Sequence, residues 1–416
     1  MLLLFPFKKK NAASLWNRWL GFNLNGRNPK MEDTMTLAFF PDELIVEIIS
    51  RLPVKTLIRF RCLNKSFNTL ISDPNFVKIH LKKSERNPHL AVPAYRYAEN
   101  EPHLLAFPIS RLLENSSTTI HYDPCYRLNH SDGSWRVVGS CNGLLCLLDR
   151  NTSPAGQRLC LWNPATRKKS KFVLGPRKYT KFFFGYDYLT ETYKVIAFRV
   201  KLDMGNGNAM VKVLSIGNSS WRNIQCLMLP LYWYQPNNNC TRVHLNGTIN
   251  WLAVRNYFDK YLNGITVVEY VIVSLDLSTE SHTQLLLPQG VDKGPCHQPT
   301  LAVLMDCLCF SYDFKRTHYV IWQMKDFGVH ESWIQLFKIS YQNLFSFNGC
   351  VMKFISFKLL PLHLSENGDT LILANDDADK AIVYNCKDNT TAKILITKQI
   401  FWRQARGYVE SLVSPR

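Results

Sequence analysis

The sequence has 416 residues, of which 46% are hydrophobic and 12% are aromatic. Disordered chains contain fewer aromatic and β-branched residues, so this composition predicts a folded protein. The length allows one large domain with a small one, or two to three ordinary domains. The formal net charge of +18 makes an acidic protein, a nucleic acid and an anionic membrane surface the partner classes to consider.

The N-terminal residues do not have the pattern of a targeting signal. An apolar run over residues 1–7 precedes Lys8, Lys9 and Lys10, which reverses the order found in a secretory signal. The run is also too short to span a bilayer. We therefore expect residues 1–38 to form a disordered N-terminal extension, and we predict no membrane partner.

The twelve cysteines are scattered, and most lie inside apolar runs, as Cys146, Cys307 and Cys309 do. This placement is typical of free thiols that pack as small hydrophobic side chains. The sequence contains no C-x-x-C pair, so we predict neither a metal site nor a cofactor. A reducing compartment, the cytoplasm or the nucleus, is the expected location.

Helical periodicity begins near residue 41. The first predicted helix repeats apolar residues at the 3.6-residue period, with charged residues on its other face: Leu44, Ile45, Ile48, Ile49 and Leu52. Pro41 suits the first helical position, and Pro53 is expected to end the helix. Three further short helices are predicted around residues 56–63, 66–72 and 76–81. A module of about forty residues is too small to enclose its own core, so it must pack against another domain or a partner.

Residues 40–67, FPDELIVEIISRLPVKTLIRFRCLNKSF, resemble the plant F-box signature over nearly their whole length. The chain departs from the usual pattern at Phe40 in place of Leu, at Leu63 and Asn64 in place of Val-Ser, and at Phe67 in place of Trp. The resemblance identifies residues 39–86 as an F-box and implies docking to the Skp adaptor and, through it, to a cullin scaffold. The adaptor-binding residues assigned on this basis, some of which must instead form the internal core, are Pro41, Leu44, Ile45, Ile48, Leu52, Pro53, Leu57, Ile58 and Phe67.

After residue 86 the pattern changes to short apolar runs separated by Gly, Asn, Asp, Ser and Pro turns, which predicts an all-β region. The strand candidates are residues 143–148, 158–162, 182–186, 193–200, 210–216, 248–254, 267–277, 307–312, 319–324, 370–375 and 381–384.

Weak repeats accompany these strands. Asn-Gly pairs begin at Asn142, Asn246 and Asn367, and such pairs favour tight hairpins because both residues accept positive φ. Polar turns follow at residues 162–166, 215–218, 276–279 and 385–388, and an aromatic residue comes soon after a turn at Phe172, Trp221 and, less cleanly, Trp333. A period of roughly 45 to 60 residues is typical of four-stranded propeller blades. A large sandwich or an irregular β domain is the alternative.

The β region is similar to the F-box-associated domain of plant F-box/kelch-repeat proteins. The likeness rests on GSCNGLLC at 139–146, LWNPATR at 161–167, FGYD at 184–187 with YKV at 193–195, and YVESLVSP at 408–415. It implies a propeller-like, kelch-type substrate-binding domain of five or six blades over residues 87–416. The tandem glycine pair of kelch repeats proper is missing, so the likeness is one of architecture. The predicted fold class is α+β multidomain, with a small helical F-box before a large all-β domain.

Candidate target-binding residues lie on loops and on a basic stretch, since loops at one rim of a propeller form a natural recognition surface. Residues 158–181 contain no acidic residue, which favours an acidic or phosphorylated target, although a solvated strand face is the simpler explanation. For Tyr232 and Trp233 a core role is equally compatible with the pattern. The candidates are Arg167, Lys168, Lys169, Lys171, Tyr232, Trp233, Tyr234 and Arg255.

No catalytic motif occurs in the sequence. The G-x-S-x-G, P-loop and H-E-x-x-H patterns are missing, and no base can be named for Cys141, so we predict no enzyme activity. The predicted function is the substrate-recognition subunit of an SCF-type cullin ubiquitin ligase. Two alternatives stay open: an F-box protein that acts as a non-ligase scaffold, and a basic β-domain protein that binds nucleic acid. The second is disfavoured because no recognisable nucleic-acid-binding module is present.

Overall fold

The structure is a computed structural model of the chain. It describes residues 42–85, 87–96, 101–114, 125–127, 135–149, 157–179, 181–200, 209–218, 220–227, 242–254, 266, 269–291, 299–344, 359–375, 380–394 and 402–415. The chain divides into two compact units, Met1–Val46 and Glu47–Arg416, and helix α2 crosses their boundary. Within the described residues, no helix has both the length and the apolarity that crossing a bilayer requires.

Four short helices open the described chain and confirm the predicted helical module. They are α2 (Asp42–Ile49), α3 (Val54–Phe60), α4 (Lys65–Ser72) and α5 (Pro74–Ser84). The predicted role of Pro53 was wrong in detail, because α2 already ends at Ile49 and Pro53 is the N-cap residue of α3. Asp73 separates α4 from α5. Its carboxylate accepts hydrogen bonds from the backbone N–H groups of Asn75 and Phe76, at 2.8 and 3.1 Å, and so caps α5.

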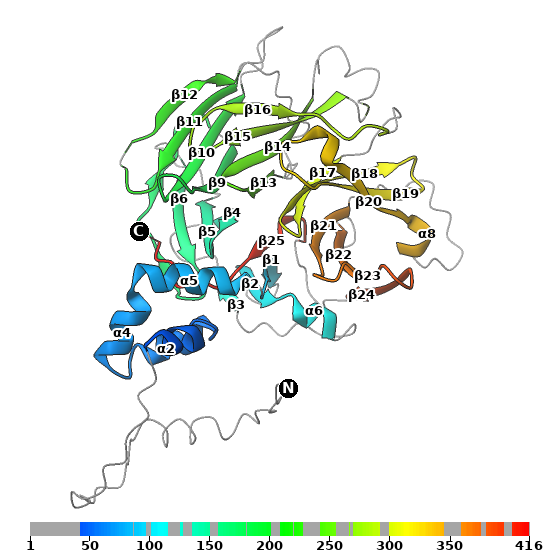
Figure 1. The fold of residues 1–416 in the computed structure, drawn as a ribbon. Helices are drawn as coiled ribbons and strands as arrows, with labels where there is room; N and C mark the ends of the chain where they lie inside the picture. Colours follow the sequence, from blue (N-terminus) through cyan, green and yellow to red (C-terminus); the bar gives the residue numbers. More distant parts are fainter. Residues whose placement is uncertain are drawn as a thin grey trace, which may run out of the picture. The chain divides into compact units, whose positions relative to one another are not determined.

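From residue 89 onward the described chain forms six antiparallel sheets, each a meander, which we call blades 1 to 6 (Figure 1). Blade 1 contains β25 (Arg406–Tyr408), β1 (His89–Arg96), β2 (Glu101–Pro108) and β3 (Cys125–Arg127). Blade 2 contains β4 (Trp135–Cys141), β5 (Leu144–Asp149) and β6 (Arg158–Asn163), and β6 pairs with two short outer strands, β7 (Lys168–Lys169) and β8 (Val173–Leu174). Blade 3 contains β9 (Lys181–Asp187), β10 (Thr192–Val200), β11 (Ala209–Ser215) and β12 (Arg222–Leu227).

The remaining blades repeat the same order. Blade 4 contains β13 (Arg242–Leu245), β14 (Thr248–Val254), β15 (Tyr270–Asp276) and β16 (His282–Leu285). Blade 5 contains β17 (Thr300–Leu304), β18 (Cys307–Phe314), β19 (His318–Met324) and β20 (Trp333–Ser340). Blade 6 contains β21 (Leu359–Leu364), β22 (Thr370–Asn375), β23 (Lys380–Asn385) and β24 (Thr390–Ile394). The short helices α6 (Ser110–Glu114), η2 (His330–Ser332), α8 (Tyr341–Leu344) and η3 (Trp402–Gln404) lie in the connections.

The two ends of the β region meet in blade 1. β25, the last strand of the chain, pairs antiparallel with β1, the first strand, with His89 opposite Tyr408 and Ala91 opposite Arg406. In Figure 1 the red β25 accordingly lies beside the cyan β1. This pairing closes the ring through backbone hydrogen bonds, so the β region is a closed six-bladed propeller. The predicted propeller is therefore confirmed, with six blades, and the alternative of a large sandwich was wrong.

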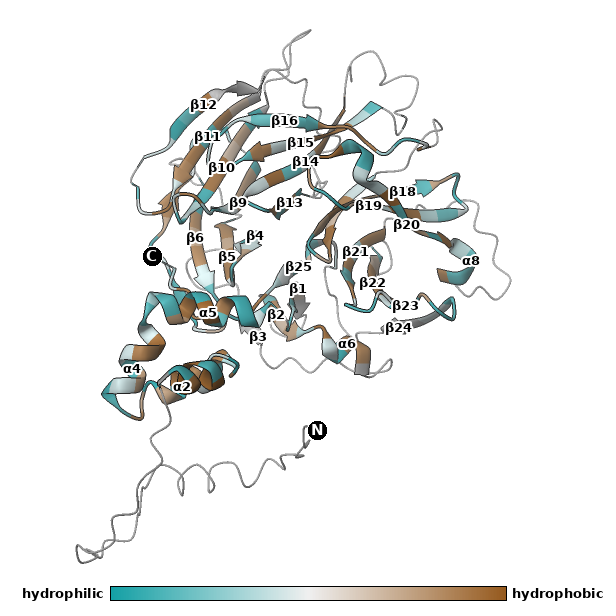
Figure 2. Ribbon diagram, in the orientation of Figure 1, coloured by the Kyte–Doolittle hydropathy of each residue, from teal (hydrophilic) through white to brown (hydrophobic). Residues whose placement is uncertain are grey.

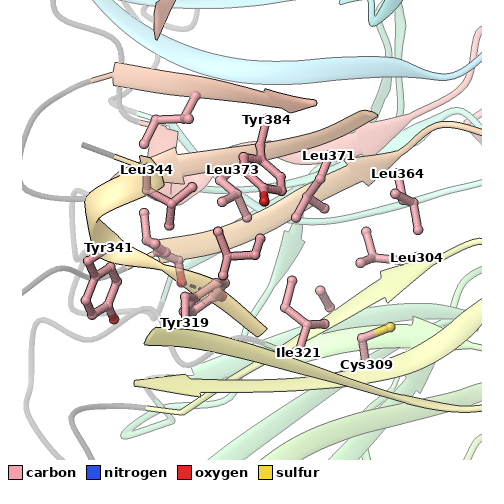
Figure 3. Packing of buried hydrophobic residues seen from close by; sticks show 14 residues of the cluster. Leu304, Cys309, Tyr319, Ile321, Tyr341, Leu344, Leu364, Leu371, Leu373 and Tyr384 are labelled. Atoms are coloured by element: carbon pink, nitrogen blue, oxygen red, sulfur yellow. Dashed lines mark hydrogen bonds between the residues drawn. The ribbon is translucent and has the colours of Figure 1, made fainter. Parts of the chain in front are cut away.

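The core of the propeller lies between adjacent blades. The described buried residues form six apolar clusters, one at each contact between neighbouring blades, including those on both sides of blade 1. Figure 3 shows one such cluster, in which Tyr319 and Ile321 of blade 5 face Leu371 and Leu373 of blade 6. Figure 2 shows the same distribution by hydropathy: apolar colour dominates central strands such as β10, and hydrophilic colour dominates the outer strand β16. Each blade is thus held by its two neighbours.

Recurring turns connect equivalent strands, as the repeats predicted. Asn142 and Gly143 both have positive φ, 50° and 79°, in the turn between β4 and β5, and Asn246 and Gly247 repeat this geometry between β13 and β14. The recurring aromatic residue also has a shared role. The Trp221 indole donates a hydrogen bond to the Leu174 carbonyl at 2.8 Å, and the Trp333 indole donates to the Leu286 carbonyl at 3.1 Å. Each of these tryptophans joins the outer part of its blade to the preceding blade.

Candidate functional site

Helix α2 exposes apolar side chains that a partner would cover. Leu44 and Ile48 lie one helical turn apart, and their exposed fractions are 48% and 49%. Leu63 and Ile79, on later parts of the module, are also exposed. Ile49, by contrast, is 3% exposed and belongs to the core of the module, with Val54, Leu57, Ile71 and Phe76. The apolar residues of the F-box therefore divide into a buried set and an exposed set, a division that sequence reasoning left open.

The structure places most of the predicted adaptor-binding residues in one set or the other. Leu57 is fully buried and therefore acts in the core, whereas Pro53 is exposed and Ile45, Leu52, Ile58 and Phe67 are half-buried. The Phe67 ring packs against Phe60, with 5.7 Å between ring centroids. Pro41 lies outside the described residues. Adaptor binding by the exposed and half-buried residues stays a prediction.

Polar contacts fix the loop that follows α2. The Glu47 carboxylate accepts hydrogen bonds from Lys83 of α5 and from Arg51, and these two contacts lower the pKa of Glu47 to about 2. Lys83 also donates to the Ser50 hydroxyl at 2.8 Å. The buried imidazole of His80 contacts the Leu52 carbonyl at 3.0 Å, and burial lowers its pKa, so at neutral pH it is uncharged. Helix α5 therefore holds the Glu47–Pro53 segment in one arrangement.

The basic stretch at residues 158–181 divides into a structural part and an exposed part. Arg158 pairs with the buried Asp149 at 2.6 Å and lies over the ring of Phe172, so it stabilises blade 2. Arg167, Lys168, Lys169 and Lys171 are all exposed, along the outer edge of the blade at β7 and the turn before it. These four exposed residues lie within five consecutive positions, and we call them the basic edge. Their role in target binding is still a prediction.

Four other predicted target-binding residues, Tyr232, Trp233, Tyr234 and Arg255, lie outside the described residues. The extension at residues 1–38 does so as well.

Sequence reasoning missed a site at the centre of the propeller. A cavity of about 220 Å³ is lined by residues of the innermost strand of every blade, namely β4, β9, β13, β17, β21 and β25. Arg242 and Arg406 line it, together with His244, and burial lowers the pKa of His244, so its imidazole is neutral at pH 7. The two arginines are far apart in the sequence and belong to blades 4 and 1. Only the order of the blades around the ring could have predicted that both arginines line the same cavity.

Cys141 has a neighbouring base after all. Its Sγ lies 3.7 Å from His244 Nδ1. Burial nevertheless raises the pKa of the Cys141 thiol far above its usual range, and the other ring nitrogen of His244 contacts the backbone N–H of Tyr186 at 3.2 Å. A neutral, buried thiol is a poor nucleophile. The pair is therefore explained by packing between blades. Among the described residues, no group of His, Cys, Asp and Glu is placed to hold a metal ion.

A small helical module with exposed apolar side chains, followed by a closed six-bladed propeller, defines a protein built from two different modules. Comparison with known proteins identifies both. Residues 107–415 match the F-box associated beta propeller domain, and residues 38–79 match the F-box domain. The propeller match covers well over half of the chain, so this protein belongs to the F-box proteins with an F-box associated β-propeller domain.

The curated relatives agree with this assignment. The F-box/kelch-repeat protein At3g23880 of Arabidopsis thaliana is 27% identical over 409 residues, which cover 92% of this chain and 99% of the relative. The F-box protein CPR1 of the same plant is 26% identical, and the match covers 73% of each chain. Among solved structures, an oligogalacturonate lyase in complex with manganese covers 70% of this chain and 69% of its own, with 11% identity and a TM-score of 0.39. A likeness this low carries no argument about function.

Proposed function

We propose that this chain is the substrate-recognition subunit of an SCF-type cullin ubiquitin ligase. The observation that carries the proposal is the exposure of Leu44 and Ile48 on α2, within a segment that matches the F-box domain. Burying a fully exposed leucine or isoleucine contributes about 1.5–3 kcal/mol, so covering the exposed halves of Leu44 and Ile48 contributes about that amount in total. A helical face of this kind fits an apolar groove on an adaptor.

In this proposal the two modules bind different partners. The F-box binds the Skp adaptor, which connects the chain to the cullin, and the propeller binds the protein to be modified. The chain itself is a non-catalytic receptor, and the other subunits carry the ubiquitin chemistry. Its contribution to the rate is to hold the lysines of the target near the activated ubiquitin, because positioning two reactants together raises their effective concentration. The cytoplasm or the nucleus is the proposed location.

We further propose that the target is acidic or phosphorylated. The net charge of +18 and the basic edge of blade 2, Arg167 to Lys171, support this proposal. Arginine binds carboxylate and phosphate groups through two parallel hydrogen bonds, and lysine adds a mobile positive charge. Tyr232, Trp233, Tyr234 and Arg255 remain further candidates for the same surface.

Co-purification with the adaptor tests the docking face. Ile48→Asp places a charge on the exposed face of α2, and we expect it to reduce recovery of the adaptor and the cullin at least tenfold. Leu189→Asp is the matched control, because Leu189 is 80% exposed in the turn after β9 and the substitution makes the same chemical change. We expect the control to leave adaptor recovery unchanged. Equal recovery by Ile48→Asp and the unaltered chain would contradict the proposed docking face.

The two alternative functions give different results. A non-ligase scaffold would not co-purify with the cullin under any condition, although the chain would be folded. A nucleic-acid-binding protein would show binding that falls steeply with salt and that is lost when Lys168, Lys169 and Lys171 are changed to Gln. In the ligase proposal, the same triple variant retains the adaptor and the cullin but loses its target.

A further inference from the structure

The central cavity of the propeller is lined by strand edges. An innermost strand pairs with a neighbour on one side only, so its second row of backbone N–H and C=O groups faces the centre. The cavity of about 220 Å³ has several times the volume of about 30 Å³ that one water molecule occupies in the liquid. It therefore has room for an anion the size of pyrophosphate or citrate.

The side chains that line this cavity are cationic or neutral. Arg242 and Arg406 are half-buried, and none of the described lining residues is acidic. The Arg406 guanidinium donates a hydrogen bond to the Ala405 carbonyl at 2.9 Å, and Ala405 itself lines the cavity. Within the described part of the chain, no carboxylate lies at ion-pair distance from Arg406. Burial and the nearby charge of Arg136 lower the pKa of Arg406 to about 10. A cation in these surroundings is stabilised when an anion joins it.

The innermost strands run in the same direction along the cavity. Arg242, at the start of β13, lies 4.8 Å from the ring of Phe183, near the start of β9, and His244 farther along β13 contacts Tyr186 farther along β9. The two strands therefore run the same way, as repeated meanders around one centre require. Four of the six innermost strands carry a basic residue at their first or second position: Arg136 in β4, Lys181 in β9, Arg242 in β13 and Arg406 in β25.

Acidic residues occur at the opposite ends of these strands. Asp306, Glu366 and Glu410 each come two residues after the end of β17, β21 and β25. The cations thus gather where the innermost strands begin and the acids where they end. A negatively charged ligand is attracted to the first mouth and repelled from the second.

We propose that the centre of the propeller is a binding site for a small multivalent anion, held by Arg406 and Arg242 through its phosphate or carboxylate oxygens. The ligand enters at the mouth where the innermost strands begin. The planar guanidinium matches both kinds of oxygen acceptor, and the surrounding protein strengthens the attraction by lowering the local dielectric constant. This site does not depend on the proposed ligase role, because the residues that form it all belong to the propeller.

Thermal unfolding and calorimetric titration of the purified full-length chain test the site, with pyrophosphate and citrate as probes. Potassium chloride at the same ionic strength is the reference for screening alone. A ligand that binds only the folded state at a hundred times its Kd raises Tm by about 3 °C for a chain of this size. We expect at least one of the two probes to produce this rise, and the one that binds more tightly identifies phosphate or carboxylate as the preferred group.

Three variants distinguish the site from general charge effects. Arg406→Gln removes the guanidinium group and its positive charge, and we expect it to weaken binding of the probe at least tenfold. Arg406→Lys keeps the positive charge but lacks the planar guanidinium, so we expect it to weaken binding several-fold. This variant still tests the site if Arg406→Gln fails to fold. Lys168→Gln, on the basic edge, should leave the affinity unchanged. Equal affinity in the unaltered chain and in Arg406→Lys, or a response to both probes no larger than the response to potassium chloride, would overturn the proposal.

Discussion

The helical module and the propeller use apolar residues in opposite ways. Helix α2 leaves Leu44 and Ile48 about half exposed, although the module is small and has few apolar residues to bury. The propeller buries its apolar residues in clusters between blades and completes its ring with its own last strand. The module is therefore built to be completed by a partner, and the propeller is complete by itself.

This difference predicts where substitutions act. In the propeller, stability depends on closure and on contacts between blades, so a change at those points should unfold a large part of the chain. In the module, an exposed apolar residue should contribute to partner binding and little to folding. Four predictions test this contrast, and they are arranged from the largest expected effect on the free energy of unfolding to the smallest.

The largest effect is expected at the point where the C-terminal segment crosses blade 2. Gly143 has φ of +79°, and a Cβ atom there would lie 2.1 Å from Ser411 Oγ and 2.8 Å from the Val409 carbonyl. Gly143→Ala must displace this segment, so we expect it to lower the free energy of unfolding by about 4 kcal/mol. Gly368→Ala is the control, because Gly368 has a similar φ of +75° but no heavy atom within 4 Å of its Cβ position. It should cost only about 1 kcal/mol in urea unfolding. Similar losses in the free energy of unfolding of both variants would show that packing of the C-terminal segment against Gly143 does not stabilise the propeller.

A buried ion pair within blade 3, next to blade 4, should make stability depend on pH. The side chains of Asp187 and Lys194 are 0% and 5% exposed and lie 2.9 Å apart, and Ser278 of blade 4 donates to Asp187 at 2.5 Å. Burial alone would raise the pKa of Asp187, but hydrogen bonds from Ser278 and Thr190 and the contact with Lys194 hold it well below the usual range. Because the folded-state pKa is the lower one, the stabilisation is present above the unfolded pKa of about 3.9 and is lost as pH falls below it.

Asp187→Asn removes this charge and leaves Lys194 less well compensated, so we expect a loss of about 3 kcal/mol at pH 7. The loss should shrink when unfolding is measured near pH 3. Asp369→Asn is the control, since Asp369 pairs with the largely exposed Lys387 and such pairs contribute less than about 1 kcal/mol. A variant that is equally destabilised at both pH values would show that the ionised pair is not the source of the stabilisation.

The side chain of Asn163 is expected to contribute somewhat less to the free energy of unfolding than the Asp187–Lys194 pair does. Its fully buried amide donates hydrogen bonds to the carbonyls of Ser411 and Val413, at 2.9 and 2.7 Å. Asn163→Ala leaves both carbonyls without this donor and should cost about 2 kcal/mol. Asn385 occupies the equivalent turn of blade 6, but its side chain bonds only within the turn. Asn385→Ala should therefore cost about 1 kcal/mol or less in the same urea titration. Equal costs for the two variants would show that the hydrogen bonds from Asn163 to the C-terminal segment add no stability of their own.

The central strands of blades 2 to 6 could be predicted from the sequence, whereas those of blade 1 and most innermost and outer strands could not. β5 is buried at every position, because it has a strand on each side and a blade on each face, and its apolar run is visible in the sequence. β25 is three residues long with only one buried, and β16 has three exposed residues out of four. Strands with one free edge lie partly in solvent, so they have no continuous apolar signal.

The same reason explains which parts of the site could be predicted. The helical period of α2 located Leu44 and Ile48, because a helix places residues four apart on one face. The period could not separate Ile48 from Ile49, since burial depends on how the helices pack. Arg242 and Arg406 were isolated cations in the sequence. They line the same cavity only because β25 closes the ring, and an arrangement made by closure leaves no local pattern.

The smallest effect on folding is expected at Ile48. Ile48 and Ile49 are adjacent residues of the same type in the same helix, but Ile48 is 49% exposed and Ile49 is 3% exposed. Ile49→Ala should leave a cavity and destabilise the module by about 3 kcal/mol, whereas Ile48→Ala should cost less than about 0.5 kcal/mol. Amide hydrogen exchange in α3 measures this difference without unfolding the propeller, since local opening of the module exposes those amides. If Ile48→Ala accelerates exchange as much as Ile49→Ala does, Ile48 is needed for folding and the contrast between the module and the propeller does not hold. If exchange is unchanged, any loss of adaptor binding caused by a substitution at Ile48 is a loss of contact, because the helices that present the residue are still formed.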